Sequence, residues 1–207
     1  MILLAIETSV SHASLGLWGD DRLLFSTTWE AERNHDSFLF PALEQALALI
    51  PAGKGLDFIL VGAGPGSYGG VRVALAAGVG IATVTEARLV AVESWAQLAD
   101  GEVCVVADAR RGGWTVRHPD GQIEVMTTEQ VQALQQPLYS TEACGVLETR
   151  GISGAQKENL IPTAEGLIRT WLAMTPEQRA NAAAKPAEPI YVRPPHITAA
   201  TRKPWEI

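Results

Sequence analysis

Cysteines and long apolar runs are both scarce in this sequence. Its only cysteines, Cys104 and Cys144, lie far apart and form no Cys-x-x-Cys pair, which excludes a disulfide framework and a zinc site built on cysteines. The longest apolar stretch, residues 73–84, is too short to span a bilayer. The first residues carry no basic segment and soon reach Glu7, unlike a signal peptide. We therefore expect a cytoplasmic protein that does not bind membranes.

Positive charge is also in short supply. The 207 residues hold 16 Lys and Arg against 23 Asp and Glu, for a net charge of −7. A protein that grips a nucleic-acid backbone by itself normally shows a basic surplus on some face. Two small basic clusters, Arg110-Arg111 and Arg202-Lys203, are interpreted as solvated surface. Direct binding of nucleic acid is therefore not expected.

Metal-binding and catalytic motifs are missing as well. The histidines show no H-x-x-x-H or H-E-x-x-H spacing, so we expect no metal site. They are His12, His35, His118 and His196. No local spacing supports a Ser/His/Asp or Cys/His arrangement for nucleophilic catalysis. We therefore expect neither a cofactor nor catalysis by this chain alone.

What the sequence does contain is a repeated α/β pattern. Apolar and alternating runs predict strands, and apolar residues at helical spacing predict helices. In the first half the expected order is strands 1–6, 13–18 and 23–29, helix 36–50, strand 57–63, helix 71–87 and strand 89–92. The second half begins alike, with strands 103–108, 114–118 and 123–126 and a helix from residue 127, and a further helix is expected over 164–174. The pattern predicts two lobes, residues 1–99 and a smaller, degenerate lobe with a tail, residues 100–207.

A glycine-rich turn joins the strand 57–63 to the helix that follows. Its characteristic residues are Gly62, Gly64, Pro65, Gly66 and Ser67. A P-loop would need a lysine after the later glycines, and a dinucleotide-binding motif would need glycine in place of Ser67. Two interpretations remain open. The backbone amides could bind an anion or another chain, or the glycines could permit a tight turn and close packing of the helix.

Two carboxylates, Glu7 and Asp108, occupy equivalent positions at the ends of the first strands of the two halves. Facing one cleft, they could hold a hydrated magnesium ion and activate water for phosphoryl transfer. Alternatively, each carboxylate hydrogen-bonds its own turn. The second interpretation is favoured because no phosphate-binding lysine accompanies them.

The two predicted helices of the first half are unusually apolar or small-sided. The helix 71–87 has a stripe of Ala74, Gly78 and Ala82, which would let another helix approach closely. The helix 36–50 is apolar over a face wider than one sheet requires. Core packing and a helix-to-helix interface with another chain both remain open.

Motifs in four ordered places resemble those of the TsaB (YeaZ-like) family. The opening ILLAIETS and the following ASLGLW resemble ILAIDTS and SVALW, and GAGPGSYGGVRVALAAGVGIA resembles G-x-GPGSFTGLRIG-x-x-x-x-GLA. VADARRGGWTV resembles DAR-x-GEVY, and AEPIYVR resembles P-x-YLR. The sequence departs from the family at Gly69, which is usually Thr, at Gly113, which is usually Glu, and around residues 141–145, where a glycine pair is not recognisable.

The resemblance implies an actin/hexokinase-type (ASKHA) fold of two ribonuclease-H-like lobes with mixed sheets and flanking helices. It also implies a role in installing threonylcarbamoyl on the adenosine next to the tRNA anticodon. TsaB-like proteins are non-catalytic paralogues of the TsaD transferase. Here Ser94 and Leu98 stand where TsaD carries two metal-binding histidines. Because neither side chain can replace an imidazole at a metal ion, we do not expect the chain to run the transfer itself.

The resemblance also implies the partners. A TsaD-like transferase is expected to bind through the two apolar helices as a helical bundle, with Leu39, Leu43, Leu47, Ala74, Gly78 and Ala82 as contact residues. A TsaE-like ATPase would join a larger complex, tRNA would be reached only through that complex, and isolated chains could form homodimers. Two alternatives remain. One is an active ATPase or small-molecule kinase using Glu7 and Asp108, and the other is a peptidase, for which the sequence offers no site.

Overall fold

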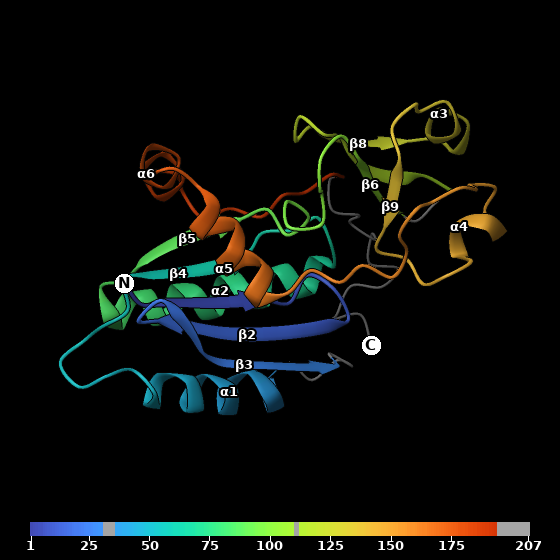
Figure 1. Cartoon of the computed structure of the whole chain (residues 1–207). Helices are drawn as coiled ribbons and strands as arrows, with labels where there is room; N and C mark the ends of the chain where they lie inside the picture. The colour runs from blue at the N-terminus through green and yellow to red at the C-terminus, as the bar shows by residue number, and fades with distance from the viewer. Residues whose placement is uncertain (31–35, 110–111, 194–207) are drawn as a thin grey trace, which may run out of the picture.

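The computed structural model describes residues 1–30, 36–109 and 112–193, which form two lobes, each built on a mixed sheet (Figure 1). The first lobe has a five-stranded sheet in the order β3-β2-β1-β4-β5, in which β1 pairs antiparallel with β2 and parallel with β4. Its strands are β1 (Leu3–Glu7), β2 (His12–Gly19), β3 (Arg22–Glu30), β4 (Phe58–Gly62) and β5 (Arg88–Val92).

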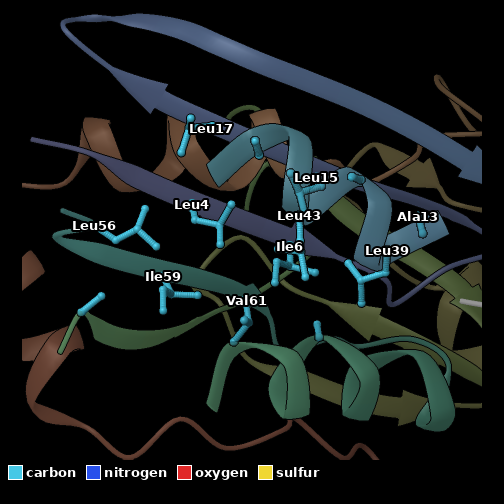
Figure 2. Close-up of a cluster of buried hydrophobic side chains, with 14 of the residues drawn as sticks. Leu4, Ile6, Ala13, Leu15, Leu17, Leu39, Leu43, Leu56, Ile59 and Val61 are labelled. Atoms are coloured by element: carbon cyan, nitrogen blue, oxygen red, sulfur yellow. The ribbon is translucent and has the colours of Figure 1, made fainter. Parts of the chain in front are cut away.

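Both faces of this sheet are covered by helices. The helices α1 (Asp36–Ala48) and α2 (Tyr68–Thr85) pack on one face, and α5 (Ala164–Ala173) packs on the other. The central strand β1 is completely buried and alternates between the two cores, with Leu4 and Ile6 toward α1 and α2 (Figure 2) and Leu3 and Ala5 toward α5. This double burial explains the continuous apolar run at the start of the sequence.

The helix α5 comes from the second half of the sequence but belongs to the first lobe. Its residues Leu167, Ile168 and Trp171 are buried against the first-lobe sheet, and the amide of Ala164 donates a 2.8 Å hydrogen bond to Ser14 Oγ of β2. The following helix α6 (Pro176–Ala184) packs beside β5. A boundary after residue 99 therefore separates the two sheets but not the helices that cover them.

The second lobe repeats the connectivity of the first on a smaller scale. Its four-stranded sheet has the order β8-β7-β6-β9, and β6 pairs antiparallel with β7 and parallel with β9. Its elements are β6 (Cys104–Asp108), β7 (Trp114–Arg117), β8 (Ile123–Met126), α3 (Thr128–Gln132), β9 (Leu138–Ser140) and α4 (Val146–Thr149). The predicted repeat, and with it the two-lobed ribonuclease-H-like fold, is confirmed.

Several details differ from the predictions. The helix α2 begins before residue 71 because Ser67 caps it, its Oγ accepting a 3.4 Å hydrogen bond from the amide of Gly70. By length and mean hydropathy, α2 also meets the criteria for a membrane span, alone among the described helices. The length and hydropathy of α2 are weak evidence for a membrane span, because the core helix of a soluble protein meets the same criteria. In this structure α2 buries Val71, Ala74 and Gly78. The two basic clusters, which were interpreted as solvated surface, lie outside the described residues, as do His35 and His196.

Candidate functional site

The glycine-rich turn between β4 and α2 is tied to the ends of β1 and β5. The amide of Ser67 donates to the carbonyl of Ser9 (2.6 Å), and Thr8 Oγ1 donates to the carbonyl of Gly70 (2.6 Å). On the other side, the amide of Gly64 donates to Ser94 Oγ (3.1 Å) and the amide of Ser94 donates to the carbonyl of Gly64 (2.8 Å). The amides of Gly64 and Ser67 are thus satisfied within the protein.

Gly66 and Gly64 of this turn disfavour a side chain for different reasons. A Cβ at Gly66 would overlap the carbonyl oxygen of Ser9, and Gly64 has φ +90°. Glycine accepts both conditions at no steric cost. Of the two interpretations left open by the sequence, the contacts favour a tight turn with close packing of α2.

Glu7, at the end of β1, lies inside the first lobe. It is completely buried, and its Oε1 accepts a 2.7 Å hydrogen bond from the amide of Ser9. Burial raises the pKa of this carboxyl above its ordinary value, because the charged form loses its hydration, although hydrogen bonds from Ser9 and Ser94 act in the opposite direction. The carboxyl is therefore enclosed among turn residues rather than presented to a ligand.

Asp108, at the end of β6, has a different environment. It lines the cleft between the lobes, and its carboxylate lies 2.6 Å from the guanidinium of Arg150. Its amide donates a 2.8 Å hydrogen bond to Glu142 Oε1. The two carboxylates that the ATPase alternative would use as a pair are thus placed differently, with Glu7 buried and Asp108 paired with Arg150.

The predicted partner-binding residues on α1 and α2 mostly face their own lobe. Leu39, Leu43, Ala74 and Gly78 are buried in the core beneath the sheet, and a Cβ at Gly78 would overlap side chains of β4 and β5. Leu47 and Ala82 are partly buried against the same core. The four buried residues therefore cover their own sheet, because an apolar stripe at helical spacing is also what a helix needs to pack on a sheet, while Leu47 and Ala82 stay predicted contact residues.

Other side chains of the same helices are exposed. Phe38, Phe40 and Leu49, in and just after α1, are 52%, 62% and 48% exposed, and Val79 and Val84 of α2 are 54% and 81% exposed. Two small residues of α2, Ala76 and Gly80, are exposed as well. In the sequence, these exposed residues differ from the buried ones only in lying outside the helical stripe that packs on the core. On α2 this difference was missed because both faces of the helix are apolar or small.

The second lobe contains an arrangement that local spacing did not reveal. Cys104 Sγ lies 3.9 Å from His118 Nδ1, and His118 Nε2 lies 3.0 Å from Glu124 Oε1. The order resembles a nucleophile, a base and an orienting carboxylate. However, Cys104 is completely buried, and burial together with the charge of Asp120 raises the pKa of its thiol. A protonated, enclosed thiol is a structural residue and not a nucleophile.

Known sequences resemble the chain over most of its length. Residues 29–164 match the protein-family model described as TsaD, tRNA N6-adenosine threonylcarbamoyltransferase. The tRNA threonylcarbamoyladenosine biosynthesis protein TsaB of Escherichia coli (strain K12) is 25% identical over 222 aligned positions, covering 93% of this chain and 95% of that protein. The protein of the same name from Bacillus subtilis (strain 168) is 32% identical over 119 residues, which are 54% of this chain. That match spans about half, 52%, of the Bacillus protein.

Solved structures agree with these sequence matches. YeaZ from Pseudomonas aeruginosa superposes with a TM-score of 0.69 at 26% identity, covering 92% of this chain and 99% of that one. A second structure, described as an uncharacterized protein with similarity to peptidase YEAZ from Pseudomonas aeruginosa, gives a TM-score of 0.70 at 26% identity, covering 93% and 99%.

Proposed function

The chain belongs to the TsaB (YeaZ) family of tRNA threonylcarbamoyladenosine biosynthesis proteins, and on that basis we propose that it acts as a non-catalytic subunit that binds a TsaD-like transferase. The exposed apolar face of α1 and α2 is the observation that carries the proposal. The proposal extends to a cytoplasmic complex that also holds a TsaE-like ATPase and brings this chain to tRNA only indirectly.

The composition of this face suits a helical partner. Large apolar side chains exposed together on a surface mark interaction sites, because leaving them in water is costly. On α2, the exposed residues Ala76 and Gly80 are one helical turn apart, and Val79 lies beside them. Small residues at this spacing let a second helix come close, while Val79 and Phe40 supply apolar area to bury. We define Phe40, Ala76, Val79, Gly80 and Val84 as the docking face.

The environments of the residues expected to carry chemistry support a non-catalytic role. Ser94, which stands at the first metal-histidine position, is buried and holds Gly64 through its hydroxyl and its amide. Leu98, at the second position, packs against the cluster that contains Trp95. Ser94 therefore supports the glycine-rich turn, and Leu98 supports a hydrophobic cluster that includes residues of β6.

The proposal is tested by measuring the affinity of this chain for the TsaD-like protein of the same cell by calorimetry. Val79→Arg places a charge at the centre of the docking face, where removal of a hot-spot contact costs about 2 kcal/mol, or roughly 30-fold in affinity. The matched control is Ala180→Arg, at an exposed position of α6 near the opposite face of the sheet. If folded Val79→Arg and Phe40→Glu both bind like the unmodified chain, the docking face is placed wrongly.

A further inference from the structure

The segment that follows α6 returns from the covered face of the first sheet to the boundary between the lobes (Figure 1). The amide of Ile190 donates a 2.8 Å hydrogen bond to the carbonyl of Ala63, at the end of β4. We call residues 190–193 the strap. Its first contact is therefore with the glycine-rich turn of the first lobe.

The next residue of the strap is anchored on the first turn of α2. The ring of Tyr191 stacks on that of Tyr68, with 5.0 Å between centroids and 29° between planes. The guanidinium of Arg72 lies 4.0 Å from the centroid of Tyr68, and its Nε donates a 3.2 Å hydrogen bond to Tyr191 Oη. Each of these three side chains therefore contacts the other two. Displacing Tyr191 would break both its ring contact with Tyr68 and its hydrogen bond with Arg72.

The end of the strap reaches the second lobe. The guanidinium of Arg193 occupies the space where a side chain at Gly113 would be, at the turn that leads into β7. The four strap residues also line a cavity of about 200 Å³ together with Trp95 and Tyr68 from the first lobe and Asp108 and Thr115 from the second. The strap thus contacts both walls of the cleft.

A second connection between the lobes is made by two side chains outside the strap. Glu93, directly after β5, forms an ion pair with the Nε of Arg117, the last residue of β7. The two side chains are only 21% and 11% exposed, so solvent and salt screen the pair weakly. Because removing one partner would leave the other charge largely buried and unpaired, this contact opposes separation of the lobes.

We propose that the strap and the Glu93–Arg117 pair together fix the angle between the lobes, so that the cleft neither opens nor closes. Two-lobed proteins that move do so about a few hinge residues, and contacts that bridge the cleft on separate elements oppose that motion. Because the strap is anchored on α2, the second lobe is held in one position relative to the docking face. The inference concerns the chain by itself and does not depend on which partner binds.

Hydrogen exchange of the full chain tests the strap. Tyr191→Ala removes the stacked ring, and we expect roughly tenfold faster exchange in residues 62–70 and 112–117, on both sides of the cleft. Tyr191→Phe keeps the ring and should change exchange little. Glu188→Ala, at an exposed position just before the strap, is the control for a general effect on this segment. Tyr191 is 41% exposed, so its replacement is expected to leave the fold intact.

Distance measurement between spin labels tests the fixed angle directly. Cys144 is exposed in the second lobe, Cys104 is buried, and Thr83→Cys supplies a second exposed site on α2. We expect one narrow distance distribution in the otherwise unmodified chain, and a broader or shifted one when Tyr191→Ala and Glu93→Gln are combined. A broad distance distribution in the otherwise unmodified chain would overturn the proposal. So would an unchanged distribution in the folded double variant, together with faster hydrogen exchange confined to residues 186–193.

Discussion

The carboxyl group of Glu7 packs directly against Gly62, so closely that any side chain at the glycine would overlap it. The end of β1 and the end of β4 therefore meet at a glycine on one strand and a buried acid on the other. The acid is held by the amide of Ser9, and the next residues of the turn are held by Ser9 and Ser94. By sequence, Glu7 resembles one of two carboxylates of a magnesium site. By its contacts, it is a buried polar residue that stabilises the turn.

The first prediction concerns the pH dependence of stability. Because the pKa of Glu7 is raised by burial, the native state binds its proton more tightly than the unfolded state does. The resulting stabilisation is fully present below the ordinary glutamate pKa of about 4.3, and it is lost as the pH rises through the raised value. Relative to Glu7→Gln, the unmodified chain should lose stability as the pH rises from 4 to 8.

Urea unfolding at several pH values checks this. Other carboxyls titrate in both proteins, so the difference between the two proteins isolates Glu7. The exposed Glu188→Gln serves as the control for the general effect of replacing a carboxyl with an amide. A pH-independent difference for Glu7→Gln would contradict the prediction.

The second prediction compares two glycines three residues apart. Gly66→Ala should destabilise the protein by about 1–3 kcal/mol or more, because its Cβ would overlap the carbonyl of Ser9. Gly69→Ala has no atom within 4 Å of its Cβ and lies in the first turn of α2, so it should be neutral or stabilise by up to about 1 kcal/mol. Thermal unfolding measures both. Equal melting temperatures would mean that the close approach to Ser9 does not restrict the turn.

A third prediction uses another pair of glycines, on α2. Gly78→Arg should prevent folding of the first lobe, because its side chain would enter the core beside Val61 and Leu89. Gly80→Arg points into open space and should keep the native circular dichroism spectrum while weakening the binding of a TsaD-like partner. Ala74→Glu, also in the core, should behave like Gly78→Arg. A folded, partner-competent Gly80→Arg would remove Gly80 from the docking face.

The fourth prediction distinguishes the two thiols. A thiol reagent should modify Cys144 in the native protein and both cysteines in denaturant, because Cys104 is buried. Mass spectrometry of the labelled peptides identifies the site. Rapid labelling of Cys104 at neutral pH would show that the thiol is accessible, and would reopen the Cys104–His118–Glu124 arrangement as a reactive site.

The sequence predicted the elements with strong periodicity and missed those that depend on contacts between distant residues. The strands β1 and β6 are continuous apolar runs ending in a carboxylate, and the pattern was sufficient to find both and to relate the two lobes. The strand β9 is only three residues long and α4 only four, too short to show a period.

The errors in the candidate site have a similar cause. The neighbours Gly78, Val79 and Gly80 are all apolar or small, so the sequence of α2 does not reveal that Gly78 faces the sheet and the other two face solvent. Likewise, Cys104 and His118 meet only because β6 and β7 pair in a register that places Val105 opposite Arg117. Both relationships are set by tertiary packing rather than by local spacing.

The contribution of α5 to the first lobe has a consequence for synthesis on the ribosome. Leu3, Leu60 and Val90 lie on the sheet face that α5 covers, and Trp171 completes that cover. Since translation is vectorial, all five strands of this sheet emerge before the helix that shields half of it. A nascent chain that has not yet exposed residue 171 therefore presents a bare apolar sheet face, a surface that makes incomplete chains prone to aggregate.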